Sequence, residues 1–207
     1  MISTNSNIPP LPRIVVLAAG FSTRLGRPKA LARIRGSSLL MRTLRVLAPF
    51  ATAPIIVVAP PRAIRLRAEL RGCRSVLVAN PLRSEGLSSS VRRGLRHARY
   101  AAAVLLLPMD FPSLERRDIA RLIARWRGAR RQVAARRIGT EAAAPLILPR
   151  RLYRRGLAIA GDAGLKTLVR QLPREQIALV RLASAAFDVD TARDLESARR
   201  HTRPRGA

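Results

Sequence analysis

The chain has 207 residues, of which 48% are hydrophobic and 25% charged, so it fits one ordinary soluble globular domain with a sizeable core. Its 40 Lys and Arg residues against 12 Asp and Glu residues give a formal charge of +28, which favours polyanionic partners. Aromatic residues make up only 3%, too few for a row of base-stacking platforms along single-stranded nucleic acid.

Charge and proline placement also argue against membrane insertion and secretion. The longest uncharged stretch, 46–61, contains four prolines and cannot form a membrane span. The single cysteine, Cys73, excludes an internal disulfide and agrees with a reducing, cytoplasmic location. We expect residues 1–12 to be a flexible tail without a signal-peptide core, 13–198 to be one domain, and 199–207 to be a basic tail.

Apolar runs alternate with amphipathic segments along the chain. Buried strands are predicted at 14–19, 55–59, 76–79 and 103–107, and helices at 39–47, 63–71, 88–99 and 114–127. The second half predicts strands at 132–136, 146–148 and 177–182, and helices at 151–158, at 165–172 and from Thr191 onward. This alternation indicates a single Rossmann-like α/β fold, a doubly wound and mostly parallel sheet with helices on both faces.

The stretch 14–31, IVVLAAGFSTRLGRPKAL, organises the rest of the chain. An apolar strand breaks at Gly20, and a strand that ends in a glycine turn presents successive backbone N–H groups that favour anions. Arg24 and Lys29 add positive charge, so we interpret the loop as a cradle for nucleotide phosphates. The spacing matches neither the phosphate loop that ends in Gly-Lys-Ser/Thr nor the G-x-G-x-x-G dinucleotide fingerprint.

Residues 17–29 do match another signature, L-A-A-G-x-S-x-R-x-G-x-P-K, and through it the chain resembles nucleotidyltransferases of the molybdenum cofactor cytidylyltransferase type. The resemblance implies a fold like that of nucleotide-diphospho-sugar transferases and a loop that holds the triphosphate. It implies catalytic roles for Arg24 and Lys29. The nucleotide-binding residues implied here are Leu17, Ala18, Ala19, Gly20, Ser22, Thr23, Arg24 and Lys29.

Asp110 follows the most apolar predicted strand directly, where ligands of open α/β sheets bind. A carboxylate there could hold Mg²⁺ that bridges nucleotide phosphates, or it could be a turn residue before Pro112. The resemblance favours the metal, since the matching Asp of the family is a metal ligand and a catalytic residue. Residues 187–195 look like the family's D-x-D-T-P-x-D-L, with Ala192 in place of Pro, which makes Asp190 a second candidate ligand ahead of Asp188.

A third strand end, 80–90, carries Asn80, Gly86 and several serines. Gly86 would let the backbone approach a flat ligand, and the serines open a helix with free N–H groups. This stretch resembles the family segment that lies against the nucleotide base, which implies base contacts for Asn80, Gly86 and Ser89. The alternative is that Ser88 or Ser89 only caps the helix.

Two further segments bear on the acceptor. Residues 161–166 look like the family's G-D-x-G-A-R, which implies acceptor contacts for Asp162 and Lys166, although Asp162 could equally be a helix N-cap. Family members typically carry Gly-His-Pro or Gly-x-Pro where this chain has Ala143-Ala144-Pro145. This departure concerns the pocket for the pterin, and therefore the identity of the acceptor.

We therefore predict an Mg²⁺-dependent nucleotidyltransferase that moves a nucleoside monophosphate to a phosphorylated acceptor and releases pyrophosphate. The resemblance implies CTP as donor, molybdopterin as acceptor, and a molybdoenzyme or its chaperone as protein partner. Ala18-Ala19 before Gly20 leans towards the cytidylyl branch. A transferase for sugar phosphates or other small phosphates remains an alternative within this fold.

The alternative from another class is a basic nucleic-acid-binding protein. In the predicted helix 114–127 one face carries Ile119, Leu122, Ile123 and Trp126 and another carries Arg117, Arg121 and Arg125. We interpret the arginines as a solvated face rather than a nucleic-acid stripe.

Overall fold

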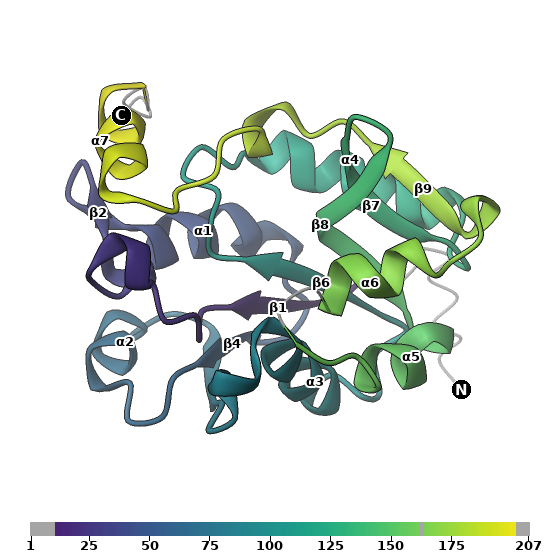
Figure 1. The fold of residues 1–207 in the computed structure, drawn as a ribbon, viewed down its shortest axis with the longest axis horizontal. Helices are drawn as coiled ribbons and strands as arrows, with labels where there is room; N and C mark the ends of the chain where they lie inside the picture. The colour runs from purple at the N-terminus through teal and green to yellow at the C-terminus, as the bar shows by residue number, and fades with distance from the viewer. Residues whose placement is uncertain (1–10, 162–163, 202–207) are drawn as a thin grey trace, which may run out of the picture.

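The computed structural model describes residues 11–161 and 164–201. A seven-stranded sheet runs through the molecule in the order β5-β4-β1-β6-β8-β7-β9 (Figure 1). The strands are β1 (Arg13–Leu17), β4 (Ile55–Ala59), β5 (Ser75–Ala79), β6 (Ala103–Pro108), β7 (Val133–Ile138), β8 (Glu141–Pro149) and β9 (Ile177–Val180). Only β8 runs antiparallel to its neighbours in this sheet, so the predicted mostly parallel α/β fold is confirmed.

Helices cover both faces of the sheet. They are α1 (Leu39–Leu47), α2 (Ile64–Glu69), α3 (Leu87–His97), α4 (Arg116–Gly128), α5 (Tyr153–Leu157), α6 (Gly164–Arg170) and α7 (Ala192–His201). Alternate residues of β1 enter two separate cores: Ile14 and Val16 join the side chains of α1 and α4, whereas Val15 joins those of α3, α5 and α6. Strands buried on both faces explain why the predicted strands were continuous in apolar character.

The ends of several elements differ from the predicted ones. Helix α4 begins at Arg116 rather than at 114, because Glu115 is extended and its N–H donates to Ser184 Oγ at 2.9 Å. Strand β9 ends at Val180, before a short 3₁₀ helix, η7 (Ala183–Ala185).

Helix α7 starts with the predicted capping box and runs further than expected. Thr191 N–H donates to Asp194 Oδ2 at 2.8 Å, and Asp194 N–H donates to Thr191 Oγ1 at 3.2 Å. The helix then continues to His201, past the expected start of the basic tail at 199.

A small antiparallel hairpin, β2 (Arg33–Ile34) and β3 (Ser37–Ser38), has no counterpart among the predicted strands. Its turn contains Arg35 and Gly36, both with positive φ. Two-residue strands are too short to show a periodicity of two, so only the Arg-Gly turn could have indicated them.

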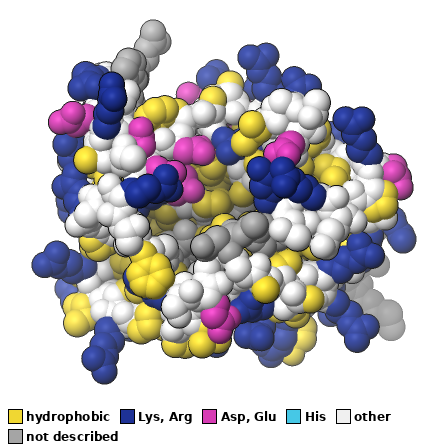
Figure 2. Space-filling model, viewed as in Figure 1, with side chains coloured by type: hydrophobic (Ala, Val, Ile, Leu, Met, Phe, Trp, Pro, Cys, Tyr) yellow, Lys and Arg dark blue, Asp and Glu magenta, His cyan; other side chains and the backbone are white. Residues whose placement is uncertain are grey.

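Helix α4 has the predicted two faces. Its apolar residues Ile119, Leu122, Ile123 and Trp126 are at most 3% exposed, whereas the arginines of the predicted charged face, Arg117, Arg121 and Arg125, are exposed. Figure 2 shows that Lys and Arg side chains are scattered over the face in view, both at its edge and nearer its centre, without a continuous strip. Among the described residues, none of the helices has the length and apolar character of a membrane span.

Gly94 of α3 sets how closely this helix approaches β1. A Cβ atom at Gly94 would lie 2.5 Å from Val15 Cγ1, and Val15 is fully buried. We predict that Gly94→Ala lowers the free energy of unfolding by about 1–3 kcal/mol, as overpacking of a core does. Gly128→Ala, which meets no atom within 4 Å, should be neutral or slightly stabilising. Urea denaturation of both variants measures this, and equal stabilities would contradict the prediction.

Candidate functional site

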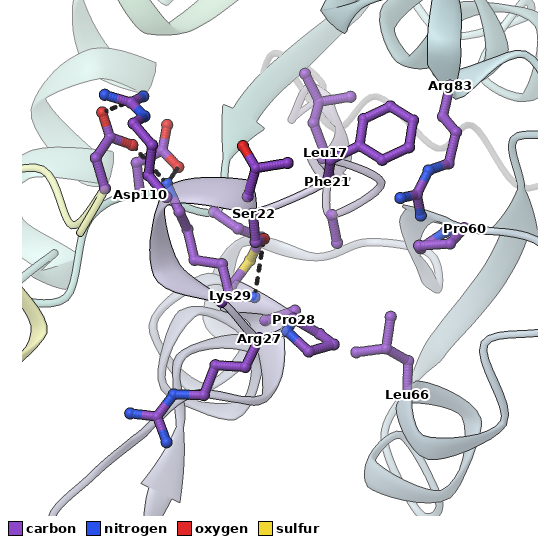
Figure 3. Close-up of a pocket in the computed structure, with 18 residues that line it drawn as sticks. Leu17, Phe21, Ser22, Arg27, Pro28, Lys29, Pro60, Leu66, Arg83 and Asp110 are labelled. Carbon is purple, nitrogen blue, oxygen red and sulfur yellow. Dashed lines mark hydrogen bonds and ion pairs between the residues drawn. The ribbon is translucent and has the colours of Figure 1, made fainter. Parts of the chain in front are cut away.

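A cavity of about 680 Å³ lies where β1, β4 and β6 end (Figure 3). In open α/β sheets this edge is where ligands bind. The predicted site residues that line it are Leu17, Ala18, Gly20, Ser22, Thr23, Arg24, Lys29, Asp110 and Asp190. The structure thus brings the glycine loop and both predicted metal ligands to one cavity.

The glycine loop is held in a tight bend by Ser22. This residue has left-handed backbone angles (φ 56°), and its carbonyl accepts from the N–H groups of Leu25 at 3.0 Å and Gly26 at 3.1 Å. Its hydroxyl accepts from the backbone N–H of Lys29 at 3.0 Å. Ser22 therefore closes the loop on itself and fixes where the Lys29 side chain begins.

The Lys29 side chain joins the two predicted metal ligands. Its Nζ donates to Asp110 Oδ1 at 2.7 Å and to Asp190 Oδ1 at 2.8 Å, and the dashed lines in Figure 3 mark these contacts. Arg24 Nη2 donates to the other oxygen of Asp190 at 2.9 Å. The Lys29 side chain is only 14% exposed, whereas that of Arg24 is 69% exposed. Arg24 is therefore the residue of this ionic end that is free to turn towards solvent.

These contacts shift the pKa values of Lys29 and Asp190. Burial alone would lower the pKa of Lys29, but Asp110 and Asp190 more than offset it, so the pKa lies above its usual value. Hydrogen bonding by Lys29, together with the charges of Lys29 and Arg24, lowers the pKa of Asp190. Lys29 and Asp190 are therefore both charged at neutral pH.

The segment that carries Asp190 is attached to the sheet by separate contacts. The N–H of Val189, which is fully buried, donates to the Asp110 carbonyl at 2.9 Å. Arg136 of β7 donates to the Ala185 carbonyl and lies 3.5 Å from Asp188 Oδ1. Burial raises the pKa of Asp188, which faces Arg136 rather than Lys29. Asp190, and not Asp188, therefore shares Lys29 with Asp110.

Comparison with known proteins agrees with this geometry. The model of the "MobA-like NTP transferase domain" matches residues 14–177, more than three quarters of the chain. The chain belongs to this family. The resemblance to nucleotidyltransferases that the glycine loop indicated is thereby confirmed.

Similar proteins come from several organisms. A protein described as a probable molybdenum cofactor guanylyltransferase from Opitutus terrae is 32% identical over 120 residues, which cover 55% of this chain and just over half, 56%, of that protein. The crystal structure of the Rv0371c homologue from Mycobacterium sp. strain JC1 is 31% identical, with a TM-score of 0.74 over 91% of this chain and 96% of that one. A crystal structure of Rv0371c from Mycobacterium tuberculosis H37Rv is 26% identical, with a TM-score of 0.76 over 92% of this chain and 100% of that one. Rv0371c has also been solved in complex with manganese.

In this MobA-like chain the predicted base-binding residues have internal partners. Asn80 is 2% exposed, its Nδ2 donates to the hydroxyls of Ser89 and Ser90 at 2.8 and 3.0 Å, and its Oδ1 accepts from Leu82 N–H. The Ser89 hydroxyl donates to the Gly86 carbonyl at 2.8 Å. Gly86 has φ 87° and ψ −173°, a conformation essentially restricted to glycine. The polar side chains of this segment thus hold the loop before α3, and neither they, Gly86 nor Ala19 line the cavity.

Lys166, one of the two predicted acceptor residues, lies at a second, smaller pocket of about 290 Å³. Lys166 lines it together with Ala143, Ala144 and Glu141, and Lys166 Nζ lies 3.2 Å from Glu141 Oε2. Hydrogen bonds from Arg170 and Lys166 lower the pKa of Glu141. Asp162 lies outside the described residues. Ala143 and Ala144, which stand where the family pattern is expected to have Gly-His or Gly-x, therefore form a wall of this pocket.

The residues present fit a divalent metal ion. Two carboxylate oxygens, from Asp110 and Asp190, already lie within 2.8 Å of one cationic nitrogen, that of Lys29. Mg²⁺ is usually bound through one or two carboxylates together with substrate phosphates and water, so a pair of carboxylates is sufficient. No cluster of three or more metal-ligating side chains occurs among the described residues.

Sequence reasoning missed the cavity residues of the end away from the carboxylates. Phe21, Pro60, Leu66 and Arg83 line this end. Phe21 carried a usable signal, because a large aromatic residue in a glycine loop is unexpected in a chain with 3% aromatics. The Arg136 contacts were also missed, since a strand residue gives no local sign of a distant partner.

We predict that Lys29→Met raises the pKa of Asp190 towards its usual value, because the main hydrogen-bond donor to that carboxylate is lost. A depressed carboxyl pKa stabilises the folded chain above the unfolded value near about 4, and this contribution is lost as pH falls through the folded pKa. The pKa of Lys29 is raised in the folded chain, so Lys29 stabilises the fold at any pH below the pKa of an unfolded lysine. This contribution is lost as the pH rises through the folded pKa. Carboxyl ¹³C NMR titration of Asp190 in the two proteins measures the shift.

The matched control is Arg27→Met, which removes an exposed cation that lines the same cavity. Its Asp190 midpoint should stay at the wild-type value. An unchanged midpoint in Lys29→Met would mean that Lys29 does not hold the carboxylate in solution.

Proposed function

We propose that this chain transfers a nucleoside monophosphate from a nucleoside triphosphate to a phosphorylated acceptor and releases pyrophosphate. The observation that carries the proposal is the ionic end of the cavity, where Lys29, Asp110 and Asp190 meet beside the glycine loop. The family match supports the same chemistry.

The reaction asks the protein mainly for positioning and charge neutralisation. The loop from Gly20 to Thr23 would receive the β- and γ-phosphates, and Arg24 and Lys29 would neutralise charge on the α-phosphate and the leaving pyrophosphate. The acceptor phosphate attacks the α-phosphorus as the bond to pyrophosphate breaks. A phosphate nucleophile is already ionised at neutral pH, so no general base is required.

Asp110 and Asp190 would hold the divalent metal ion, for which Mg²⁺ is our proposal. When bound, such an ion polarises phosphate oxygens and offsets their charge. The manganese complex of Rv0371c supports divalent metal use within this fold, at 24% identity.

We propose CTP as the donor, on the basis of Ala18-Ala19 before Gly20. GTP is the second candidate, because the relative from Opitutus terrae is described as a probable guanylyltransferase. For the acceptor we propose molybdopterin, and a sugar phosphate as the alternative. The alanine wall formed by Ala143 and Ala144 is where the acceptor pocket departs from the family pattern.

Pyrophosphate release tests the proposal. CTP, GTP, ATP and UTP are each incubated with Mg²⁺ or Mn²⁺ and with molybdopterin or a panel of sugar phosphates. We expect release with CTP and molybdopterin, and a loss of at least about 100-fold in kcat for Lys29→Ala and Asp110→Asn, because each removes charge stabilisation of the transferred phosphoryl group. Arg125→Ala, which removes an exposed arginine of α4, should leave turnover unchanged.

The proposal would be contradicted if none of the donor and acceptor pairs gave pyrophosphate release. If the chain then bound DNA or RNA tightly, with an affinity that Lys29→Ala leaves intact, the basic nucleic-acid-binding alternative would be correct.

A further inference from the structure

The end of the cavity away from Asp110 holds an arginine stacked on an aromatic ring. Arg83 Cζ lies 3.8 Å from the centroid of the Phe21 ring, and Figure 3 shows the two side chains facing each other on that side. Phe21 comes from the glycine loop, and Arg83 from η4 (Arg83–Glu85), which follows β5. The contact therefore joins two walls of the same cavity.

The contact leaves the Phe21 ring largely exposed and the Arg83 guanidinium without a hydrogen-bond acceptor among the described residues. Phe21 is 54% exposed, although burial of an aromatic ring is favourable. Within residues 11–161 and 164–201, the Arg83 guanidinium makes no hydrogen bond or ion pair, so its five N–H donors are open to a ligand or to solvent. Pro60 and Leu66 also line this end of the cavity, so it is more apolar than the opposite end, where Lys29, Asp110 and Asp190 meet.

We propose that the Phe21 ring stacks on the nucleobase of the bound nucleoside triphosphate. Arg83 is a positioning residue: it covers one face of the Phe21 ring and so orients the opposite face towards the base. This inference rests on the proposed function, because it takes the cavity to be the nucleotide site. A nucleotide carries a polyanion at one end and a flat ring at the other, and the cavity is divided in the same way. Base–aromatic stacking tolerates every base, so the pair contributes affinity without choosing the base.

The first test uses Phe21→Trp as a reporter. The chain has one tryptophan, Trp126, which is 2% exposed and gives a constant background. We expect CTP and GTP to quench the emission that the substitution adds, and tripolyphosphate, which has no base, to leave it unchanged. Quenching by tripolyphosphate to the same extent would put the ring at the phosphate end and overturn the proposal. So would quenching by a pterin phosphate and not by the nucleotides, since the ring would then hold the acceptor.

The second test removes the ring. Phe21→Leu should weaken the binding of all four nucleoside triphosphates by about tenfold, the usual effect of losing one stacked base, and leave tripolyphosphate binding unchanged. The matched control is Tyr100→Leu, which removes another exposed ring covered by an arginine, Arg99 at 4.4 Å, outside the cavity. Calorimetric titration measures both variants. Equal nucleotide affinity in the two variants would overturn the proposal.

Arg83 is tested through kinetics. Arg83→Gln should raise KM for the triphosphate several-fold at constant kcat, and Arg83→Lys should restore part of the loss, because it keeps a cation over the ring. A fall in kcat at constant KM would assign Arg83 to the chemical step and overturn its positioning role.

The two proposals fail in different ways. Nucleotide-dependent quenching in Phe21→Trp without any pyrophosphate release would leave the stacking wall standing and refute the transferase. Pyrophosphate release with an unchanged KM for the triphosphate in Phe21→Leu would support the transferase and refute the stacking wall.

Discussion

The Lys29 ammonium lies 2.7 Å from Asp110 and 2.8 Å from Asp190, and this contact holds together three parts of the chain that are far apart in sequence. A largely buried ammonium is costly unless counter-charges surround it, and two adjacent carboxylates repel each other unless a cation lies between them. Each group therefore requires the others. The glycine loop, the end of β6 and the segment before α7 consequently form one unit.

Further buried contacts make this end of the cavity rigid. Asp118 of α4 is fully buried, and its Oδ2 accepts from both the N–H and the hydroxyl of Ser184 at 2.7 Å. A buried carboxylate is tolerated only when it is hydrogen-bonded in this way. Together with Arg136 and the Val189 N–H, it fixes the path of the chain towards Asp190. Catalysis by positioning needs such a fixed frame.

The formal charge of +28 also shapes the surface of the folded chain. Many of the few acidic residues already have cationic partners, as Glu141 has in Lys166 and Arg170, so little acidic surface remains to balance the arginines. On the face of Figure 2 the basic side chains are dispersed rather than aligned. A field of this sign raises the local concentration of polyanionic ligands without selecting among them. A triphosphate is such a ligand, and the cavity supplies the selection.

The sequence by itself determined the strands of the seven-stranded sheet, most helices and the glycine loop, because these depend on residues close together along the chain. The signals were the apolar periodicity, the turn at Gly20 and the fixed offsets of Arg24 and Lys29. It also pointed to Asp110, since a carboxylate directly after a buried strand must lie at the ligand-binding edge of the sheet. The direction of Asn80 and Ser89 into their own loop, and the pairing of Phe21 with Arg83, were decided only by the tertiary structure. Such contacts join residues whose separation along the chain has no periodicity, so only the packing of whole elements brings them together.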